Sequence, residues 1–432
     1  MSSSHPKPLQ TAKDLTSGDA LLKFCLCEAA RCGRTLASLG MTSMAIERRE
    51  ATNTKMAKRK RTTTRLIVAA SETDPDMLYA TKFWAPDPFI FLERNGRRTL
   101  VLSDLEIDRG RKQADADEFV MFSELEREVQ GKSRKTPPYE KVLAHFLRKR
   151  GVKSAIVPAG FPLGYAEGLA ANKIRIRATD GLFWPEREAK SATEIELMGR
   201  ALRITEAGLR RSIEILKASK PGARKRLRWS GKSLTSEILR AEIDSTILRA
   251  GGVPTGTIVA GGDQACDPHE RGSGPLYANS LIILDVFPRD AKTGYFGDMT
   301  RTVLRGRASE AQRKLWDTVK TGQALALKKI KAGVDGMAIH KAIQQFFADR
   351  GFPTEIRKGR RVGFFHGTGH GLGLEIHEHP RLQKVTLKER QVLTVEPGLY
   401  YPGVGGVRLE DVVVVTKTGC KILSRFPKRL EI

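Results

Sequence analysis

The chain has 432 residues, of which 40% are hydrophobic and 29% are charged, so its length predicts two domains and its composition predicts a globular protein. The formal net charge of +26 leaves an anionic partner such as nucleic acid open, although basic clusters are more often solvated loops. There is no apolar run long enough to span a bilayer and no apolar stretch of a secretory signal near the start. We therefore expect a cytoplasmic protein without a membrane partner.

Residues 1–62 have no sustained hydrophobic periodicity, and we expect a disordered or dispensable extension there. Because Met56 opens a segment that leads directly into the first expected strand, our hypothesis is that residues 1–55 do not belong to the native protein. Three of the five cysteines fall in this extension, and the chain has no paired Cys-x-x-Cys motifs. This excludes a zinc finger and predicts free thiols in a reducing compartment.

Residues 63–188 alternate short apolar runs with helical patterns, which predicts an α/β domain. Strands are expected at 66–70, 89–93, 99–103 and 154–157, and the clearest helix is expected at about 137–150. No group of His, Cys, Asp and Glu has ligand-like spacing in this stretch. We therefore expect a structural role here, such as shaping a cleft or forming a dimer contact.

A second domain is expected at residues 191–426, beginning with a long amphipathic helix. Ser191 and Glu194 have the form of a capping box, and apolar residues follow at helical spacing. Further helices are expected at 237–248, 309–332 and 335–350, and strands at 281–286, 299–304, 392–396 and 412–416. This pattern predicts an α+β domain with mainly hairpin-connected strands.

Two carboxylates mark the segment 281–304. An apolar strand delivers Asp285, where a charged side chain is costly unless it is compensated. After a turn with Pro and Gly, Asp298 opens the return strand and shares a face with Thr300. A hairpin would bring the two acids to one point, although ordinary turn acids would give the same pattern.

A glycine-rich segment of fourteen residues contains four of the eight histidines: His366, His370, His377 and His379. Imidazoles bind metals and carry protons near neutral pH. Glycines allow the backbone to approach a ligand or a metal closely. This density favours a functional cluster over a purely structural one.

Two further carboxylates lie in the segment 392–416. Glu396 ends an apolar strand before Pro-Gly, and Glu410 lies just before a strand of four valines. Buried acids need compensating positive charge, and Arg408 can pair with one of the four acids but not with all of them. Two divalent metal ions would balance four carboxylates, with one neutral histidine completing the ligand set.

Oxygen-rich ligation with one imidazole favours manganese, cobalt or iron over a structural zinc of the thiolate type. Two ions roughly 3.5–4 Å apart can lower the pKa of a bridging water and hold a tetrahedral intermediate, which is the chemistry of amide hydrolysis. We therefore expect two divalent ions as cofactors, with Mn²⁺ favoured and Co²⁺, Fe²⁺ and Zn²⁺ as alternatives.

The three segments together resemble the pita-bread metallopeptidase family, which includes aminopeptidase P, prolidase and methionine aminopeptidase. The stretch SETDPDMLYATKFWAPDPF at 71–89 resembles the N-terminal domain of aminopeptidase P, prolidase and creatinase. The resemblance covers about residues 66–425. It implies a creatinase-type α/β N-terminal domain, a pita-bread α+β catalytic domain and a homodimer.

The resemblance also implies five metal ligands: Asp285, Asp298, His370, Glu396 and Glu410. Asp298 and Glu410 would bridge the two metals. Asp285 would be a terminal ligand of one metal, and His370 and Glu396 would be terminal ligands of the other.

Four residues are implied near the substrate: His269, His366, His377 and Arg408. The three histidines would hold the substrate or donate to a developing oxyanion, where hydrogen-bond donors accelerate acyl transfer most. Glu396 is implied as a second kind of catalytic residue, relaying a proton from the bridging water to the leaving amine.

Departures within the family narrow the expected activity. Creatinase lacks the metal set, which is complete here, and the segment GVRLED at 406–411 resembles the proline-peptide enzymes rather than methionine aminopeptidase. We expect removal of the N-terminal residue from peptides with proline in second position, by an Xaa-Pro aminopeptidase or dipeptidase that uses a metal-bridging hydroxide. Asp285 and Asp298 lie thirteen positions apart where the family usually has eleven, and an even insertion preserves side-chain parity.

Two alternatives stay open. The chain could be a non-catalytic pita-bread binding protein that uses its basic surface for nucleic acid, because fold alone does not fix function. It could also use the same metal pair on a small molecule. The expected partner is a peptide substrate, with nucleic acid less favoured but not excluded by the net charge of +26.

Overall fold

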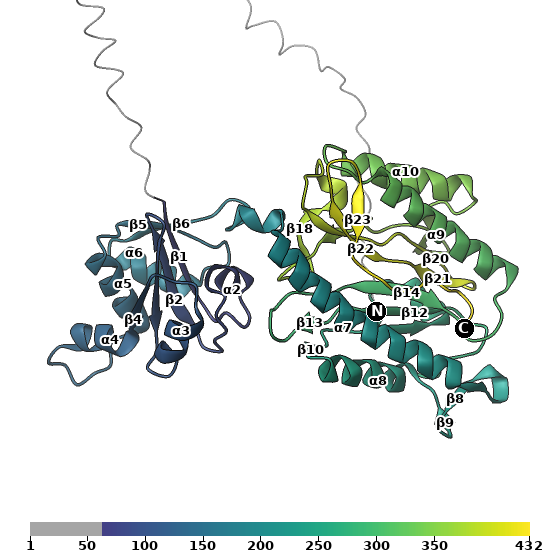
Figure 1. Ribbon diagram of the computed structural model, residues 1–432, viewed down its shortest axis with the longest axis horizontal. Coiled ribbons are helices and arrows are strands. Elements are labelled where there is room, and N and C mark those ends of the chain that lie inside the picture. Colours follow the sequence, from purple (N-terminus) through teal and green to yellow (C-terminus); the bar gives the residue numbers. More distant parts are fainter. Residues whose placement is uncertain (1–62) are drawn as a thin grey trace, which may run out of the picture. The chain divides into compact units, whose positions relative to one another are not determined.

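The computed structural model describes residues 63–432 (Figure 1). These residues belong to one unit of the chain by their contacts. The expectations for residues 1–62 lie outside the described residues. The boundary expected near residue 188 stays a prediction. No helix within 63–432 is both long and apolar enough to cross a membrane.

A six-stranded mixed sheet forms first, in the order β4-β3-β2-β1-β5-β6. Its strands are β1 (Thr64–Ala69), β2 (Phe89–Arg94), β3 (Arg97–Leu102), β4 (Glu118–Met121), β5 (Ser154–Val157) and β6 (Arg175–Ala178). Its helices are α2 (Pro75–Thr81), α3 (Ile107–Gln113), α4 (Phe122–Gln130), α5 (Tyr139–Lys149) and α6 (Leu163–Ala171). The four strands and the helix expected here are confirmed to within a few residues.

Both faces of this sheet are buried, as its continuous apolar strands require. In β1, Leu66 and Val68 face one hydrophobic core, whereas Ile67 faces another. Helix α5 supplies the first core with Val142 and Phe146. The sheet is therefore covered on both sides.

The long helix expected next is α7 (Ala192–Ala218), which is preceded by the short 3₁₀ helix η1 (Pro185–Glu188). Its capping box is confirmed: Glu194 N donates to Ser191 Oγ at 3.2 Å, and Ser191 N donates to Glu194 Oε2 at 2.8 Å. The other expected helices are confirmed as α8 (Ser236–Arg249), α9 (Glu310–Lys329) and α10 (Gly336–Asp349). Short 3₁₀ helices are η2 (Ala223–Lys225), η3 (Gly262–Cys266) and η4 (Leu382–Lys384).

Two further sheets, of three and five strands, carry the segments that the sequence singled out. One has the order β11-β12-β14, and the other has the order β18-β17-β19-β22-β23. Their strands are β11 (Ile258–Gly261), β12 (Ile282–Val286), β14 (Met299–Val303), β17 (His370–Gly371), β18 (Glu378–Arg381), β19 (Val392–Val395), β22 (Asp411–Val415) and β23 (Cys420–Ile422). The four expected strands correspond to β12, β14, β19 and β22.

Small two- and three-stranded sheets complete the fold. Their strands are β7 (Lys220–Pro221), β8 (Leu227–Trp229), β9 (Lys232–Ser233), β10 (Gly252–Val253), β13 (Arg289–Asp290), β15 (Glu355–Arg357), β16 (Arg360–Val362), β20 (Gly398–Tyr401) and β21 (Gly405–Arg408).

The run of valines in β22 is explained by two cores on opposite faces of its sheet. Val412 and Val414 pack into the core that contains α7 and α8. Val413 and Val415 pack into the core that contains α9 and α10. Figure 1 shows these two helix pairs with the strands between them. A strand buried on both faces has no polar side, which is why the sequence shows no alternation there.

The hairpin expected within 281–304 is confirmed, because β12 and β14 pair antiparallel. The connection between β12 and β14 contains β13, which pairs with β10 rather than forming a plain turn. Strands β19 and β22 pair with each other, but the separate β20–β21 hairpin lies between them in sequence. Two cysteines of the described residues, Cys266 and Cys420, are free thiols as expected.

Candidate metal centre

A single cavity of about 680 Å³ brings together all nine residues expected to bind metal or substrate. They are Asp285, Asp298, His370, Glu396 and Glu410 from the expected ligands, and His269, His366, His377 and Arg408 from the expected substrate residues. The segments that supply them lie up to 141 positions apart, because residues 269 and 410 are the first and last of the set. The fold therefore gathers distant residues into one site.

Adjacent strands position the first two acids. Asp285 lies in β12 opposite Thr300 of β14, and Asp298 directly precedes β14. Asp285 is 8% exposed and Asp298 is 4% exposed. The two inserted residues did not separate these acids, since both line the same cavity.

Glu410 is held against the same strand by two hydrogen bonds. Its backbone N–H donates to Thr300 O at 3.1 Å, and Thr300 Oγ1 donates to Glu410 Oε2 at 2.8 Å. Thr300 thus orients the carboxylate as well as the backbone of Glu410.

His370 enters from β17 with a defined orientation. Its Nδ1 lies 3.0 Å from Gly371 O, which can only accept, so Nδ1 carries the proton and Nε2 is free to bind a cation. Nε2 lies 3.7 Å from Asp298 Oδ2 and 3.3 Å from Glu396 Oε1. Burial lowers the pKa of His370 to about 3, which keeps the ring neutral.

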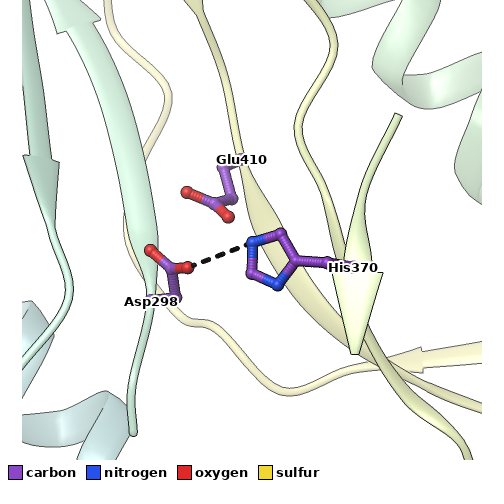
Figure 2. Close-up of side chains that lie close together, drawn as sticks. All are labelled: Asp298, His370 and Glu410. Atoms are coloured by element: carbon purple, nitrogen blue, oxygen red, sulfur yellow. Dashed lines mark ion pairs between the residues drawn. The ribbon is translucent and has the colours of Figure 1, made fainter. Parts of the chain in front are cut away.

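Three of the expected ligands form a compact group. Ligand atoms of Asp298, His370 and Glu410 all lie within 4.8 Å of one another, and all three residues are buried. Figure 2 shows their side chains converging from separate segments of the backbone. Two carboxylates and one imidazole at this separation form a possible site for a divalent metal ion.

The pKa shifts of the acids in this cavity indicate that a cation would stabilise them. Burial raises the pKa of Asp298 and Glu410 well above the ordinary range, and repulsion from neighbouring acids adds to the effect. Burial likewise raises the pKa of Glu396 to about 7. Asp285 Oδ1 is buried without a hydrogen-bond partner among residues 63–432. The donor set and the unsatisfied oxygen therefore suit divalent cations.

Arg408 pairs with one acid of the cavity, as the sequence allowed. Its guanidinium donates to Asp285 Oδ2 at 2.8 Å and to Tyr400 Oη at 3.0 Å. The arginine is 3% exposed. Its partner is Asp285 rather than the nearer residue in sequence, Glu410.

The cavity histidines differ in how firmly they are held. His366 Nδ1 lies 2.9 Å from Gly367 O, so Nδ1 carries the proton, and Nε2 accepts from Tyr400 Oη at 2.8 Å. In this tautomer Nε2 carries no proton, so it can donate to an oxyanion only after the ring changes its protonation. His377 lies with its ring centroid 4.5 Å from that of His370, nearly perpendicular to it. His269 is exposed at the cavity.

Several residues of the site were not found from the sequence. Arg381 and Lys384 line the cavity, and His340 of α10 lies with its Nδ1 2.8 Å from Thr368 Oγ1. Tyr400 connects Arg408 to His366. The pairing of β20 with β21 places Tyr400, because Gly398 lies opposite Arg408 and Tyr400 shares the face of Gly398. His379 is exposed and lies outside the cavity lining.

The chain is similar in sequence to a known protein family and to several known proteins. The sequence profile of metallopeptidase family M24 matches residues 196–417. An Xaa-Pro dipeptidase from Pyrococcus horikoshii is 27% identical over 315 residues, which cover 71% of this chain and 84% of that protein. An uncharacterized peptidase of Bacillus subtilis, YqhT, is 34% identical over 251 residues, which cover 56% of this chain and 64% of that protein.

Solved structures share the fold. An Xaa-Pro dipeptidase from Bacillus anthracis has a TM-score of 0.71 at 22% identity and covers 86% of this chain and 95% of that chain. An X-Pro aminopeptidase from Thermotoga maritima has a TM-score of 0.71 at 23% identity and covers 85% of this chain and 97% of that chain. These likenesses extend over both the N-terminal sheet and the cavity-bearing part.

Proposed function

Because the chain belongs to metallopeptidase family M24, we propose that it removes the N-terminal residue from peptides with proline in second position. The observation that carries the proposal is the buried group of Asp298, His370 and Glu410 inside a cavity that His269, His366 and His377 also line. The names of relatives support the choice of substrate, since they include Xaa-Pro dipeptidases.

We propose that two divalent ions bind in this cavity, with Mn²⁺ favoured by the oxygen-rich donor set. Their ligands would be Asp285, Asp298, His370, Glu396 and Glu410. When bound, such ions supply Lewis acidity that activates water and polarises a peptide carbonyl.

The side chains around the ligands would fix their orientation. Thr300 holds the carboxylate of Glu410, and the Gly371 carbonyl keeps His370 in the tautomer that presents Nε2. Arg408 fixes the direction of the Asp285 carboxylate through its 2.8 Å contact. Preorganised groups of this kind cost no reorganisation during the reaction.

The substrate would be held by His269, His366, His377 and Arg408. Of these, Arg408 acts at a distance, because its donors are occupied by Asp285 and Tyr400. Tyr400 would orient His366 relative to Arg408, since its hydroxyl accepts from Arg408 and donates to His366. Glu396, at the cavity wall, is the candidate for carrying a proton to the leaving amine.

The organisation of the chain follows the same proposal. Residues 63–188 would form a creatinase-type N-terminal domain, and residues 191–426 would form the catalytic domain. A homodimer would be the working assembly. The non-catalytic nucleic-acid alternative is not favoured, because every residue expected for metal and substrate lies in one cavity.

The test is hydrolysis by the purified protein of an Xaa-Pro dipeptide and of an Xaa-Pro-Yaa tripeptide, with an Xaa-Ala-Yaa tripeptide as the control. Each is assayed after chelation and again after Mn²⁺ is restored. We expect metal-dependent release of the first residue from the proline peptides, and the preferred length separates dipeptidase from aminopeptidase. Failure to cleave any of the three, with metal bound, would refute the proposal.

A further inference from the structure

A second cluster of buried charges adjoins the loop that forms one wall of the cavity. The carboxylate of Glu378 lies 2.5 Å from the guanidinium of Arg187 and 2.6 Å from the ammonium of Lys190. The three side chains are 4%, 6% and 2% exposed, respectively. Burying charged side chains costs desolvation free energy unless each charge has an opposite charge beside it.

Glu378 also binds the backbone of its own loop. Its Oε1 accepts from Leu374 N at 2.7 Å and from Glu375 N at 3.1 Å. At Gly373, a Cβ would lie 2.6 Å from the Glu378 carboxylate, so a side chain at this position would have to displace that carboxylate. The carboxylate therefore closes the loop from 373 to 378 on itself.

This loop carries two residues of the cavity wall, Ile376 and His377. The His377 ring lies across that of His370 at 4.5 Å between centroids. His377 is itself exposed, and the contacts that fix the loop run through its neighbour Glu378. The orientation of an exposed side chain depends on the backbone that presents it.

The positive partners come from a distant segment. Arg187 belongs to η1 and Lys190 follows it, 191 and 188 positions from Glu378, respectively. Arg187 also contacts Asp76 of α2 and Glu375 of the loop, each at 2.8 Å. One arginine thus joins the N-terminal sheet's first helix to the cavity loop.

We propose that Glu378 is a positioning residue that sets the place of His377 in the cavity, and that Arg187 and Lys190 hold Glu378 for this purpose. The inference rests on the proposed function, because His377 is taken to act on the substrate. It extends the site to the segment that precedes α7, whose Arg187 and Lys190 do not line the cavity themselves.

The decisive measurement is a double-mutant cycle in kcat between Glu378→Gln and His377→Ala. If Glu378 acts through His377, Glu378→Gln lowers kcat about ten-fold or more in the wild-type background, as misplacement of a reacting group does. In the His377→Ala background the same substitution then changes kcat less than two-fold. An equal loss in both backgrounds would overturn the proposal.

Asp290→Asn is the matched control. Asp290 is a fully buried carboxylate that accepts from Lys292 N at 2.8 Å and pairs with Arg200 at 2.6 Å, so it has the same kinds of partners. It makes no contact with the loop at 373–378 among those found in the described residues. We expect its kcat to stay within two-fold of wild type, and a loss equal to that of Glu378→Gln would mean that destabilisation alone explains the effect.

A second readout needs no activity. With selectively labelled histidine, the NMR signal of the His377 ring should shift in Glu378→Gln and in Glu378→Asp, which keeps the charge if the first variant does not fold. It should not shift in Asp290→Asn. An unmoved His377 signal in a folded Glu378 variant refutes the positioning role. Absence of peptide cleavage by the wild type would instead refute the proposed function and leave this measurement valid.

Discussion

Two buried groups of carboxylates in this chain are built in opposite ways. Around Glu378, two cations and two backbone N–H groups meet one carboxylate. In the cavity, Asp298 and Glu410 face each other and Glu396, while Arg408 is bound to Asp285. The first group is complete within the chain, and the second lacks positive charge.

The pKa shifts express this difference. Burial tends to raise the pKa of Glu378, but Lys190 and Arg187 outweigh burial and lower it. Burial raises the pKa of Asp298 and Glu410, and their neighbours, being acids, raise it further. Charges that a fold needs for stability are neutralised internally, whereas charges left unmatched in a cavity indicate a cation to be bound.

The largest effect should follow from removing an acid of the incomplete group. Asp298→Ala or Glu410→Ala should reduce peptide turnover to background, because each removes an expected bridging ligand. Metal content by elemental analysis should fall in the same variants. Asp290→Asn, which removes a buried charge elsewhere, is the control and should retain turnover. Full activity with normal metal content in either alanine variant would show that the ligand assignment is wrong.

Removing the acid of the complete group should lower stability in addition to kcat. Glu378→Gln leaves Arg187 and Lys190 buried without their shared partner, which should lower the free energy of unfolding by about 3–5 kcal/mol. Denaturant unfolding monitored by Trp fluorescence measures this change.

The contribution of Glu378 to the free energy of unfolding should depend on pH. The pKa of Glu378 in the folded state lies below its ordinary value of 4.5, so the unfolded state binds more protons between the two values. The contribution of Glu378 is therefore complete above pH 4.5 and is lost as the pH falls through the folded-state pKa. Glu378→Gln should flatten this acid limb of the stability profile, and an unchanged limb would contradict the assignment.

The contrast also explains what could be predicted from the sequence. Acids at the ends of apolar strands, such as Asp285 and Glu396, are locally conspicuous because burial makes them costly. Their strands were found from apolar runs. The acids of the incomplete group were therefore conspicuous in the sequence, whereas the choice of His370 among four histidines came from the family resemblance.

The complete group was not visible, for a physical reason. Glu378 lies among histidines that drew attention, but its partners are 188 and 191 positions away. Local patterns show that a side chain is buried, but they do not show which distant cation meets it. The same limit hid the pairing of β10 with β13, since strands of two residues carry no periodicity. It also hid the link from Arg408 to His366 through Tyr400.

Adding a cation should stabilise the protein through the acids of the cavity. This gain in free energy should be smaller than the loss in Glu378→Gln. A hundred-fold excess of Mn²⁺ over its dissociation constant should stabilise the chelated protein by about 2.7 kcal/mol for one site. Thermal unfolding should show a rise in Tm for wild type and for Glu378→Asp, whose expected metal ligands are unchanged. Asp298→Ala should show no rise. A similar rise in all three proteins would place the cation outside the cavity.

The smallest effect should come from an ion pair that belongs to neither group. Arg98 and Asp115 lie 2.7 Å apart with side chains 36% and 60% exposed, in the N-terminal sheet and the loop after α3. Water screens such a pair and already solvates both charges, so Asp115→Asn should change the free energy of unfolding by less than about 1 kcal/mol. The change should shrink further in 1 M salt, because the Debye length is then only about 3 Å. A loss as large as that of Glu378→Gln would mean that burial does not determine how much a carboxylate contributes.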